Sequence, residues 1–580
     1  MEFNAFPSVS EIFRYRKQRG VNLGSWFVLE PWITQVPFRF AAAPAQSDLD
    51  VAKGSYAKLV LEKHWDSWIV ESDWAWLKDH GFNTVRLPIG YYHLRGIDPS
   101  VLNGTDFSTH LAVYEGAWER IVNAIQTARN FGIGVLIDLH AAPGKQNPDS
   151  HAGTSSPNVQ FFSNRYNLSH TTHVLSVLVK HIAAFENIVG VELINEPRPN
   201  VQQGEGEILK KWYLDTYHSL QQIDPTMPVY IGDCWDTEGY AEFISKSPGD
   251  RTTGWFVLDH HLYRCFTQED TRMSIQEHIN SVTNPNSYTP QLFSRVSAKL
   301  CSSGAAMIVG EWSGAVNPGS LQGTPPHEEN RKRSEWLKGQ LSLYEKNCAG
   351  WFFWCYKKEQ KGDLGWSLRD SFEANVFPPL PTLINGANMP SDDDRAQKRE
   401  VAKSKAYGEH VAYWSKYPGD YEHWRFADGF LQGWNDAWLF FDTSMNACQQ
   451  GQKTAIQELG FQGPWLRRRL RQHVSVKGSG NGRCYWEFEH GFQQGMGASK
   501  TEIASPVGYP QNLLAAANVS CVFFPCFSGG SPCLNRIQNT ASPLCFPLLH
   551  LLTSQSMHKL ADEKHRDGAG TYNLCYQVHR

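Results

Sequence analysis

Eight short apolar segments recur along the chain between longer amphipathic stretches, and this alternation limits the possible fold more than any other pattern. The segments cover residues 20–24, 84–89, 134–140, 189–197, 228–233, 256–263, 305–314 and 350–357. Runs such as VLIDL and VGVELI are almost continuously apolar, which is typical of strands buried on both faces of a parallel sheet. Residues 114–131 and 171–185 instead have helical periodicity. Eight strand–helix repeats predict an α/β protein built on a closed (β/α)8 barrel, a TIM barrel.

The chain divides into four predicted regions. Residues 1–19 form an N-terminal lead-in, and residues 20–416 form the barrel, which a helix over residues 402–414 is expected to close. Residues 417–499 form a small aromatic-rich unit that is expected to pack on the barrel. Over residues 500–580 proline, cysteine and serine increase and helical periodicity fades, so we expect a poorly ordered tail. An alternative is that this tail is an artefact of the gene model.

Charge and hydropathy exclude several classes of partner. The net charge of -4 and the pI near 6.6 argue against nucleic acid and anionic membrane surfaces. The sequence contains no apolar run of about 18 residues, so no membrane span is expected. We therefore expect a monomer with neither a nucleic-acid nor a membrane partner.

The cysteines and the N-terminus bear on cofactors and location. The 12 cysteines show none of the CxxC or Cys/His spacings of a metal site, so we expect no metal and no other cofactor. The first residues lack an apolar run of the length that a secretory signal needs. We therefore expect reduced thiols in the cytoplasm. Secretion is the alternative if the N-terminus is incomplete.

Polar residues at the carboxyl ends of the predicted strands form a candidate active site, because these ends surround one mouth of a barrel. The residues are Arg86, His140, Asn195, Glu196, His261, Tyr263, Glu311 and Trp354. Glu196 and Glu311 follow the fourth and seventh strands and are expected on opposite walls of the mouth. Either glutamate alone could be a structural salt-bridge partner, but the pair at two strand ends favours catalysis.

Two facing carboxyl groups can cleave a glycosidic bond. One protonated carboxyl donates to the leaving oxygen, and one carboxylate attacks the anomeric carbon. A separation of about 5–5.5 Å leaves no space for a separate water and requires double displacement with retention. We expect Glu196 to be the general acid/base, with a pKa raised by the second carboxylate. We expect Glu311 to be the nucleophile, with a pKa lowered by Arg86.

Seven motifs, in order along the chain, give the sequence a resemblance to glycoside hydrolase family 5. They are GVNLGSWFVLEPWIT, GFNTVRLPIGYYHL, VLIDLHAAPGKQN, INEP, DHHLYRCF, VGEWSGA and GWFFWCYK. More closely, the chain resembles the fungal exo-β-1,3-glucanases (glucan 1,3-β-glucosidases), and the missing signal peptide resembles their intracellular branch. The resemblance covers residues 19–414, and YEHWRFADGFLQGW and YWEFEHGFQQG extend it to about residue 498.

The resemblance implies a retaining hydrolase that releases glucose from the non-reducing end of β-1,3-glucans. Glu196 matches the acid/base of the family and Glu311 its nucleophile. Asn195 matches the residue that bonds the sugar 2-hydroxyl, an interaction that strengthens in the transition state. Tyr263 matches the residue that hydrogen-bonds the nucleophile, and Arg86 belongs to the same supporting group.

Further matches concern the sugar itself. The resemblance implies that His140 and His261 bond sugar hydroxyls. It implies that Glu30 and Asn147 hold the glucose at the non-reducing end, which makes such a pocket exo-acting. Trp354 matches the aromatic platform under that sugar.

Three departures from the family pattern affect substrate binding. Phe266 matches one ring of an aromatic clamp at the entrance, but Pro148 lies near the position of the other. Tyr356 stands where a tryptophan is frequent, which affects a subsite. Residues 35–47, QVPFRFAAAPAQS, differ from the usual loop after EPWIT, which bears on the wall that makes the pocket exo-acting.

Two alternatives to this function remain open at the level of sequence. The first keeps the chemistry and changes the substrate to a β-1,6- or β-1,4-glucan or to the glucosyl head of a glycolipid, since such enzymes differ mainly in their loops. The second is a non-catalytic glucan-binding protein. Hydrolysis of an aryl β-glucoside would separate the second alternative from an enzyme.

Overall fold

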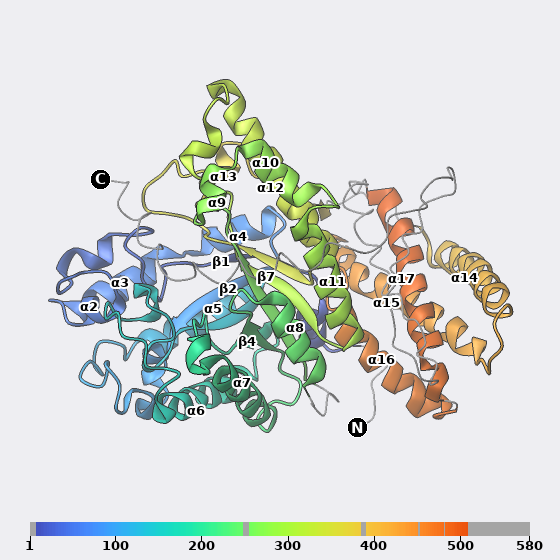
Figure 1. Cartoon of the computed structure of the whole chain (residues 1–580), viewed down its shortest axis with the longest axis horizontal. Helices are drawn as coiled ribbons and strands as arrows, with labels where there is room; N and C mark the ends of the chain where they lie inside the picture. The colour runs from blue at the N-terminus through green and yellow to red at the C-terminus, as the bar shows by residue number, and fades with distance from the viewer. Residues whose placement is uncertain (1–6, 248–253, 384–389, 450–452, 481, 508–580) are drawn as a thin grey trace, which may run out of the picture.

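The computed structural model describes residues 7–247, 254–383, 390–449, 453–480 and 482–507. Its centre is a closed barrel of eight parallel strands that neighbour one another in chain order (Figure 1). The strands are β1 (Gln18–Asn22), β2 (Thr84–Gly90), β3 (Gly134–Ala141), β4 (Ile188–Glu192), β5 (Val229–Gly232), β6 (Phe256–Leu262), β7 (Ala306–Trp312) and β8 (Gly350–Phe353). Each strand overlaps one of the predicted segments, so the predicted (β/α)8 barrel is confirmed.

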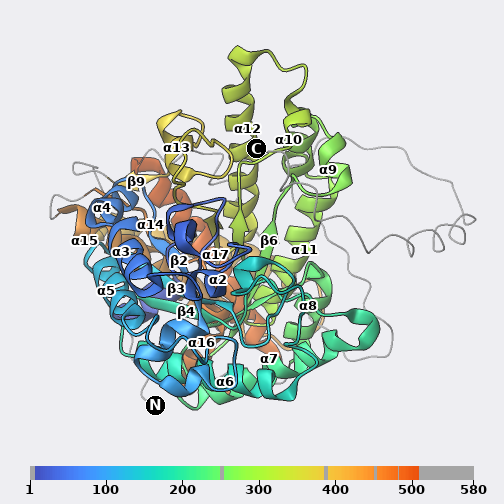
Figure 2. The ribbon, with the colours of Figure 1, turned by 90° about the vertical axis from the view of Figure 1, so that its left-hand side faces the viewer.

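Helices connect the strands and cover the outside of the barrel (Figures 1 and 2). They are α1 (Val9–Tyr15), α2 (Asp48–Ala52), α3 (Ala57–Trp68), α4 (Glu71–Asp79), α5 (Ala117–Asn130), α6 (Arg165–Ile182), α7 (Glu205–Gln221), α8 (Thr237–Lys246), α9 (Gln268–Arg272), α10 (Ile275–Thr283), α11 (Tyr288–Ser302), α12 (Pro326–Asn347) and α13 (Leu368–Glu373). Short 3-10 helices lie in the loops, at Val36–Phe40, Tyr91–Gly96, Pro99–Leu102, Ser150–Ala152, Val201–Gln203, Pro318–Leu321 and Gly482–Cys484. Within the described ranges, no helix is both long and apolar enough to cross a membrane.

Local sequence signals explain where several helices begin. Ser274 and Glu277 form a capping box at the start of α10, in which each side chain bonds the backbone N–H of the other residue. The Asn164 side chain accepts from the Tyr166 backbone N–H and so caps α6. All residues of the eight barrel strands are buried, since side chains fill the interior and helices cover the outside.

Residues from both ends of the chain close the amino-terminal end of the barrel. Tyr15 of α1 lies between Trp255 and Trp465, with ring centroids 4.4 and 4.8 Å away. One buried cluster joins residues of the strands to residues of the C-terminal helices, including Leu136, Val189, Tyr230, Val257, Ile308, Phe352, Phe461, Trp465, Leu466, Phe488, Phe492 and Met496. The barrel and the C-terminal helices therefore share one hydrophobic cluster.

The C-terminal helices are α14 (Asp392–Trp414), α15 (His423–Gln449), α16 (Gln462–Lys477) and α17 (Tyr485–Val507), and they lie together beside the barrel (Figure 1). Two glycine pairs spaced by four residues bring α15 and α17 into very close contact. A Cβ atom on Gly429 or Gly433 would lie within 2.1 Å of a carbonyl oxygen of α17, and one on Gly491 or Gly495 would lie 2.0 Å from a carbonyl oxygen of α15. Only glycine fits at these four positions.

Two predicted boundaries differ from the structure. The helix over residues 402–414, predicted to close the barrel, is part of α14, which packs on α15 and α17. Ion pairs from Arg395 to Asp442 and from Lys398 to Glu502 connect α14 to these two helices. Residues 500–507, which were predicted to belong to the tail, are instead the end of α17. The prediction of a poorly ordered tail otherwise concerns residues 508–580, which lie outside the described residues.

Candidate active site

Arg86 on β2 is buried and connects the residues predicted for catalysis. Its guanidinium donates to Glu311 Oε1 at 2.9 Å and to Asn195 Oδ1 at 2.8 Å. Its further partners are Glu192, Asn22 and Asp138, at 2.7, 3.0 and 3.1 Å. Burial opposes the charge, but the surrounding carboxylates raise the pKa of Arg86 well above its usual value. A permanently charged guanidinium therefore orients both a predicted catalytic glutamate and its neighbouring asparagine.

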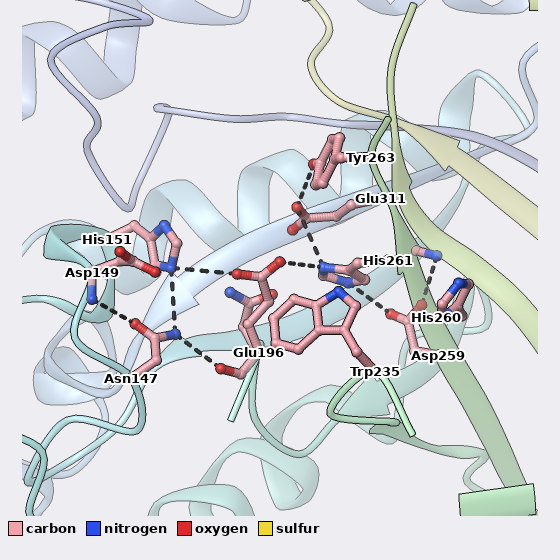
Figure 3. Close-up of polar contacts among 12 residues, drawn as sticks. Asn147, Asp149, His151, Glu196, Trp235, Asp259, His260, His261, Tyr263 and Glu311 are labelled. Carbon is pink, nitrogen blue, oxygen red and sulfur yellow. Dashed lines mark hydrogen bonds and ion pairs between the residues drawn. The ribbon is translucent and has the colours of Figure 1, made fainter. Parts of the chain in front are cut away.

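The two predicted catalytic carboxylates face one another across the mouth (Figure 3). One oxygen of Glu196, one oxygen of Glu311 and a ring nitrogen of His261 all lie within 4.8 Å of one another. His261 Nδ1 is 2.8 Å from Glu196 Oε1 and 3.5 Å from Glu311 Oε2. Tyr263 Oη donates to Glu311 Oε2 at 2.7 Å. Glu196 also has a left-handed backbone (φ 43°), a costly conformation that clusters at functional sites.

The pKa values of the two glutamates are shifted in opposite directions from their usual values. Burial raises the pKa of Glu196, but the hydrogen bond and charge of His261 outweigh it, with further contributions from His151 and Arg198, and the net pKa lies well below its usual value. Burial raises the pKa of Glu311 above its usual value, although nearby positive charges oppose this. The prediction of a raised pKa for Glu196 and a lowered pKa for Glu311 is therefore wrong.

The reason lies in how positive charge is distributed. The prediction assigned the charge of Arg86 to Glu311, whereas Arg86 also pairs with the buried Glu192. The prediction also left out the proton on His261, which lies closer to Glu196 than to Glu311. The pKa of His261 is raised well above its usual value, because the surrounding carboxylates outweigh the effect of burial.

His140 at the end of β3 is held in a fixed orientation. Its Nδ1 lies 2.6 Å from Asp138 Oδ2, which fixes the proton on that nitrogen. Its Nε2 lies 3.4 Å from the Asn195 amide nitrogen, so the imidazole accepts from that amide. The imidazole stacks on Trp354 with a centroid distance of 5.7 Å and an interplanar angle of 10°. The structure thus brings His140, Asn195 and Trp354 together as the sequence predicts.

Glu30 lies at the same side of the mouth. Its carboxylate accepts from Trp32 Nε1 at 2.8 Å, and burial raises its pKa to about 8, so it is protonated at neutral pH. Asn147 donates to the Glu196 carbonyl oxygen at 3.1 Å and lies 3.4 Å from His151 Nε2. The Asn147 amide therefore supports the backbone that carries Glu196. His151 lies between the carboxyl groups of Glu30 and Glu196, 4.0 Å from Glu30 Oε2 and 3.8 Å from Glu196 Oε2.

Two further residues at the mouth were not predicted from the sequence. His151 follows Asn147 in the loop after β3, and burial lowers its pKa to about 4, so it is neutral at neutral pH. Trp235 follows β5 and is 48% exposed, and Arg198, which lies 5.4 Å from its ring centroid, is also 3.9 Å from Glu196 Oε2 (Figure 3). A signal for Trp235 was present, because an aromatic residue directly after a barrel strand is placed at the mouth.

The positions that depart from the family pattern have distinct surroundings. Phe266 is 39% exposed at the mouth, and its ring lies 5.7 Å from Tyr263 and 5.9 Å from Trp366. Pro148 is exposed on the loop after β3. Tyr356 is buried behind β8, where its hydroxyl donates to Asp73 on α4.

The unusual loop at residues 35–47 is attached to the loop after β8. Glu359 Oε2 accepts from Thr34 Oγ1 at 2.8 Å and from the backbone N–H of Gln35 and Val36 at 2.6 and 3.2 Å. Next to this contact the Trp32 and Trp366 rings lie 5.4 Å apart. The loops after β1 and β8 therefore form one continuous wall beside Glu30.

A (β/α)8 barrel with two facing carboxylates at the ends of β4 and β7, a buried arginine and aromatic rings at its mouth is the arrangement of a glycoside hydrolase. Comparison with known proteins agrees with this class. The family model described as cellulase (glycosyl hydrolase family 5) matches residues 59–360, and that of the glucan 1,3-beta-glucosidase 3 C-terminal domain matches residues 395–503. The chain belongs to glycosyl hydrolase family 5, and it is a glycosidase.

Individual relatives extend the match over most of the chain. Glucan 1,3-beta-glucosidase 3 of Schizosaccharomyces pombe is 30% identical over 493 residues, which cover 83% of this chain and 94% of the relative. An uncharacterized glycosyl hydrolase of Saccharomyces cerevisiae is 29% identical over 512 residues, which cover 84% and 91% of the two chains. The crystal structure of a rutinosidase from Aspergillus niger aligns with a TM-score of 0.48 and 18% identity, over 63% of this chain and 99% of that one.

Proposed function

We propose that the protein is a retaining exo-β-glucosidase that releases glucose from the non-reducing end of β-1,3-glucans. The observation that carries the proposal is the spacing of Glu196 and Glu311, which have oxygens within 4.8 Å of each other. Inverting enzymes need about 6.5–9.5 Å between the carboxyl groups, because a water molecule must fit between carboxylate and sugar. The shorter spacing supports direct attack by a carboxylate.

In the first step Glu311 attacks the anomeric carbon, the glycosidic bond breaks, and the departing oxygen takes a proton from Glu196. The low pKa of Glu196 means that this proton is first held by His261, which passes it from Nδ1 to Glu196 Oε1 across 2.8 Å. In the second step a water molecule attacks the anomeric carbon and displaces Glu311, which releases β-glucose. The proton of the water passes through Glu196 back to His261, which restores the starting state. Tyr263 and Arg86 each hold one oxygen of Glu311 in line for attack.

The exo specificity rests on the side of the mouth that carries Glu30. A protonated Glu30 and a neutral His151 can both hydrogen-bond hydroxyls of a terminal glucose, and Trp354 offers a ring face beneath it. The wall formed by the loops after β1 and β8 limits the extension of a glucan chain beyond that glucose. The β-1,3 linkage is supported by the relative from Schizosaccharomyces pombe, which is named glucan 1,3-beta-glucosidase 3.

The test is product analysis of laminarin digestion, with proton NMR following the anomer that appears first. Glucose as the sole product, released as the β-anomer, is the expected result. Oligosaccharides would contradict exo action, and first release of the α-anomer would contradict retention. Activity on β-1,6- or β-1,4-glucans or on a glucolipid in place of laminarin would support the first alternative substrate class, and a complete lack of glucosidase activity would support a binding protein.

Monomeric state and cytoplasmic location stay predictions. Light scattering of the purified chain is expected to give a mass near the 65.7 kDa of one chain. Cell fractionation tests the location, since a secreted enzyme would appear in the medium.

A further inference from the structure

A second cluster of possible metal-ligating side chains lies among the C-terminal helices, outside the barrel. It consists of His410 near the end of α14, His423 at the start of α15 and Glu487 in the first turn of α17. These three helices lie together beside the barrel (Figure 1). His423 belongs to the motif YEHWRFADGFLQGW and Glu487 to the motif YWEFEHGFQQG, and the catalytic site gives neither motif a role.

The three side chains direct their ligand atoms toward one another. His410 Nε2 lies 3.0 Å from Glu487 Oε2, and His423 Nδ1 lies 2.7 Å from the same oxygen. All three atoms lie within 4.8 Å of one another. In a tetrahedral zinc site with bonds of about 2.0 Å, neighbouring ligand atoms are about 3.3 Å apart. The two contacts to the carboxylate would therefore lengthen by only about 0.3 and 0.6 Å around an ion.

Each of the three groups is held in its orientation by a further contact. The His410 imidazole stacks on Phe426, with a centroid distance of 4.1 Å and an interplanar angle of 19°. The His423 imidazole stacks on Tyr421, with a centroid distance of 5.1 Å and an interplanar angle of 10°. The second oxygen of the carboxylate accepts from the Glu422 backbone N–H at 2.7 Å. Contacts of this kind orient the ligands of a metal ion and strengthen its binding.

Burial and charge at this cluster suit a cation. The side chains of Glu487 and His410 are buried, whereas 22% of the His423 side chain is exposed, which leaves a path for an ion and a water ligand. Burial raises the pKa of Glu487, but the hydrogen bonds from both imidazoles and from the Glu422 N–H outweigh it, and the pKa lies below its usual value. Burial lowers the pKa of His490, whose ring lies 5.4 Å from that of His410, to about 4, so His490 adds no positive charge at neutral pH.

We propose that His410, His423 and Glu487 form a zinc site that joins α14, α15 and α17. Two imidazole nitrogens and one carboxylate oxygen are ligands that Zn²⁺ takes, with water as the fourth, whereas Ca²⁺ and Mg²⁺ prefer oxygen ligands alone. The expectation of no metal rested on cysteine spacings, which carry no information about two histidines and a glutamate from three helices. The inference is independent of the proposed glucosidase activity, because its ligands lie outside the barrel.

The experiment measures binding of Zn²⁺ to the untagged full chain after treatment with a chelator. Calorimetric titration with Zn²⁺ is expected to show a site that His423→Asn weakens at least about 100-fold. Asparagine carries an amide N–H close to the position of Nδ1, so this variant keeps a hydrogen bond to Glu487 and loses the imidazole ligand. Added Zn²⁺ is expected to raise the melting temperature of the wild type and to leave that of His423→Asn unchanged.

A matched control is His327→Ala, since the His327 side chain is 80% exposed on α12. This variant is expected to bind Zn²⁺ as the wild type does, and melting curves in the presence of chelator establish that each variant is folded. A wild type that does not bind Zn²⁺ would overturn the inference, and the contacts among the three side chains would then be hydrogen bonds alone. Equal Zn²⁺ affinity of the wild type and His423→Asn would also overturn it, because the ion would then lie elsewhere on the chain.

Discussion

Glu30 is a buried carboxyl group that must be protonated when the protein is folded near neutral pH. Burial raises its pKa from 4.5 to about 8, and the carboxylates of Glu311 and Glu196 add to the effect. A group whose folded pKa lies above its unfolded pKa binds more protons in the folded state between these two values. The contribution of Glu30 to the free energy of unfolding therefore falls as pH rises from 4.5 to about 8, and it changes little above that range.

Glu30→Gln removes this dependence, because an amide has no proton to lose. From the two pKa values, the wild-type carboxyl lowers the free energy of unfolding by about 1 kcal/mol at pH 5 and about 4 kcal/mol at pH 8, relative to a side chain that cannot ionise. The free energy of unfolding of the variant, relative to the wild type, is thus expected to rise by about 3 kcal/mol between pH 5 and pH 8. The assay is urea unfolding followed by tryptophan fluorescence at several pH values.

Glu207→Gln is the matched control, since its side chain is 82% exposed on α7. Its difference from the wild type is expected to be small and equal at all pH values. A Glu30→Gln difference that stays constant within about 0.5 kcal/mol from pH 5 to pH 8 would refute the reasoning, because Glu30 would then be ionised in the folded protein.

Four further substitutions test other parts of the argument. Glu311→Gln is expected to lower kcat at least about a thousand-fold without changing the melting temperature, and a smaller loss would contradict its role as nucleophile. Glu196→Ala is expected to regain activity on activated aryl glucosides with added azide, giving a β-glucosyl azide that NMR identifies; no rescue would count against the acid/base. His151→Ala is expected to lower kcat/KM for aryl β-glucosides about 10-fold, mainly through KM, if it binds the terminal glucose. Gly491→Ala is expected to destabilise the protein by about 3 kcal/mol in urea unfolding, because its Cβ would lie 2.0 Å from a carbonyl oxygen, whereas Gly206→Ala, with open space around it, is expected to be tolerated.

Much of the fold was predictable, because strands buried on both faces have a sequence pattern that is difficult to mistake. The boundary of the C-terminal helices was not, since the apolar face of α14 does not indicate which surface it covers. In the structure that face packs on α15 and α17. The glycine pairs of α15 and α17 became interpretable only when the two helices were seen in contact.

The site residues at strand ends were predictable because barrel topology fixes their place. Arg86, Asn195 and Glu311 are brought together as expected. The pKa directions were not predictable, because they depend on distances among several charges. His261 lies between both glutamates, and no spacing in the sequence reveals that position.

The hydrophobic cluster shared by the barrel and the C-terminal helices affects how this chain unfolds. Strand residues such as Val257 and Ile308 are covered by Phe461, Trp465 and other residues that lie far later in the sequence. Loss of the C-terminal helices would leave the floor of the catalytic barrel bare to water. In this chain the C-terminal helices and the barrel strands that they cover are thus expected to unfold as one cooperative unit.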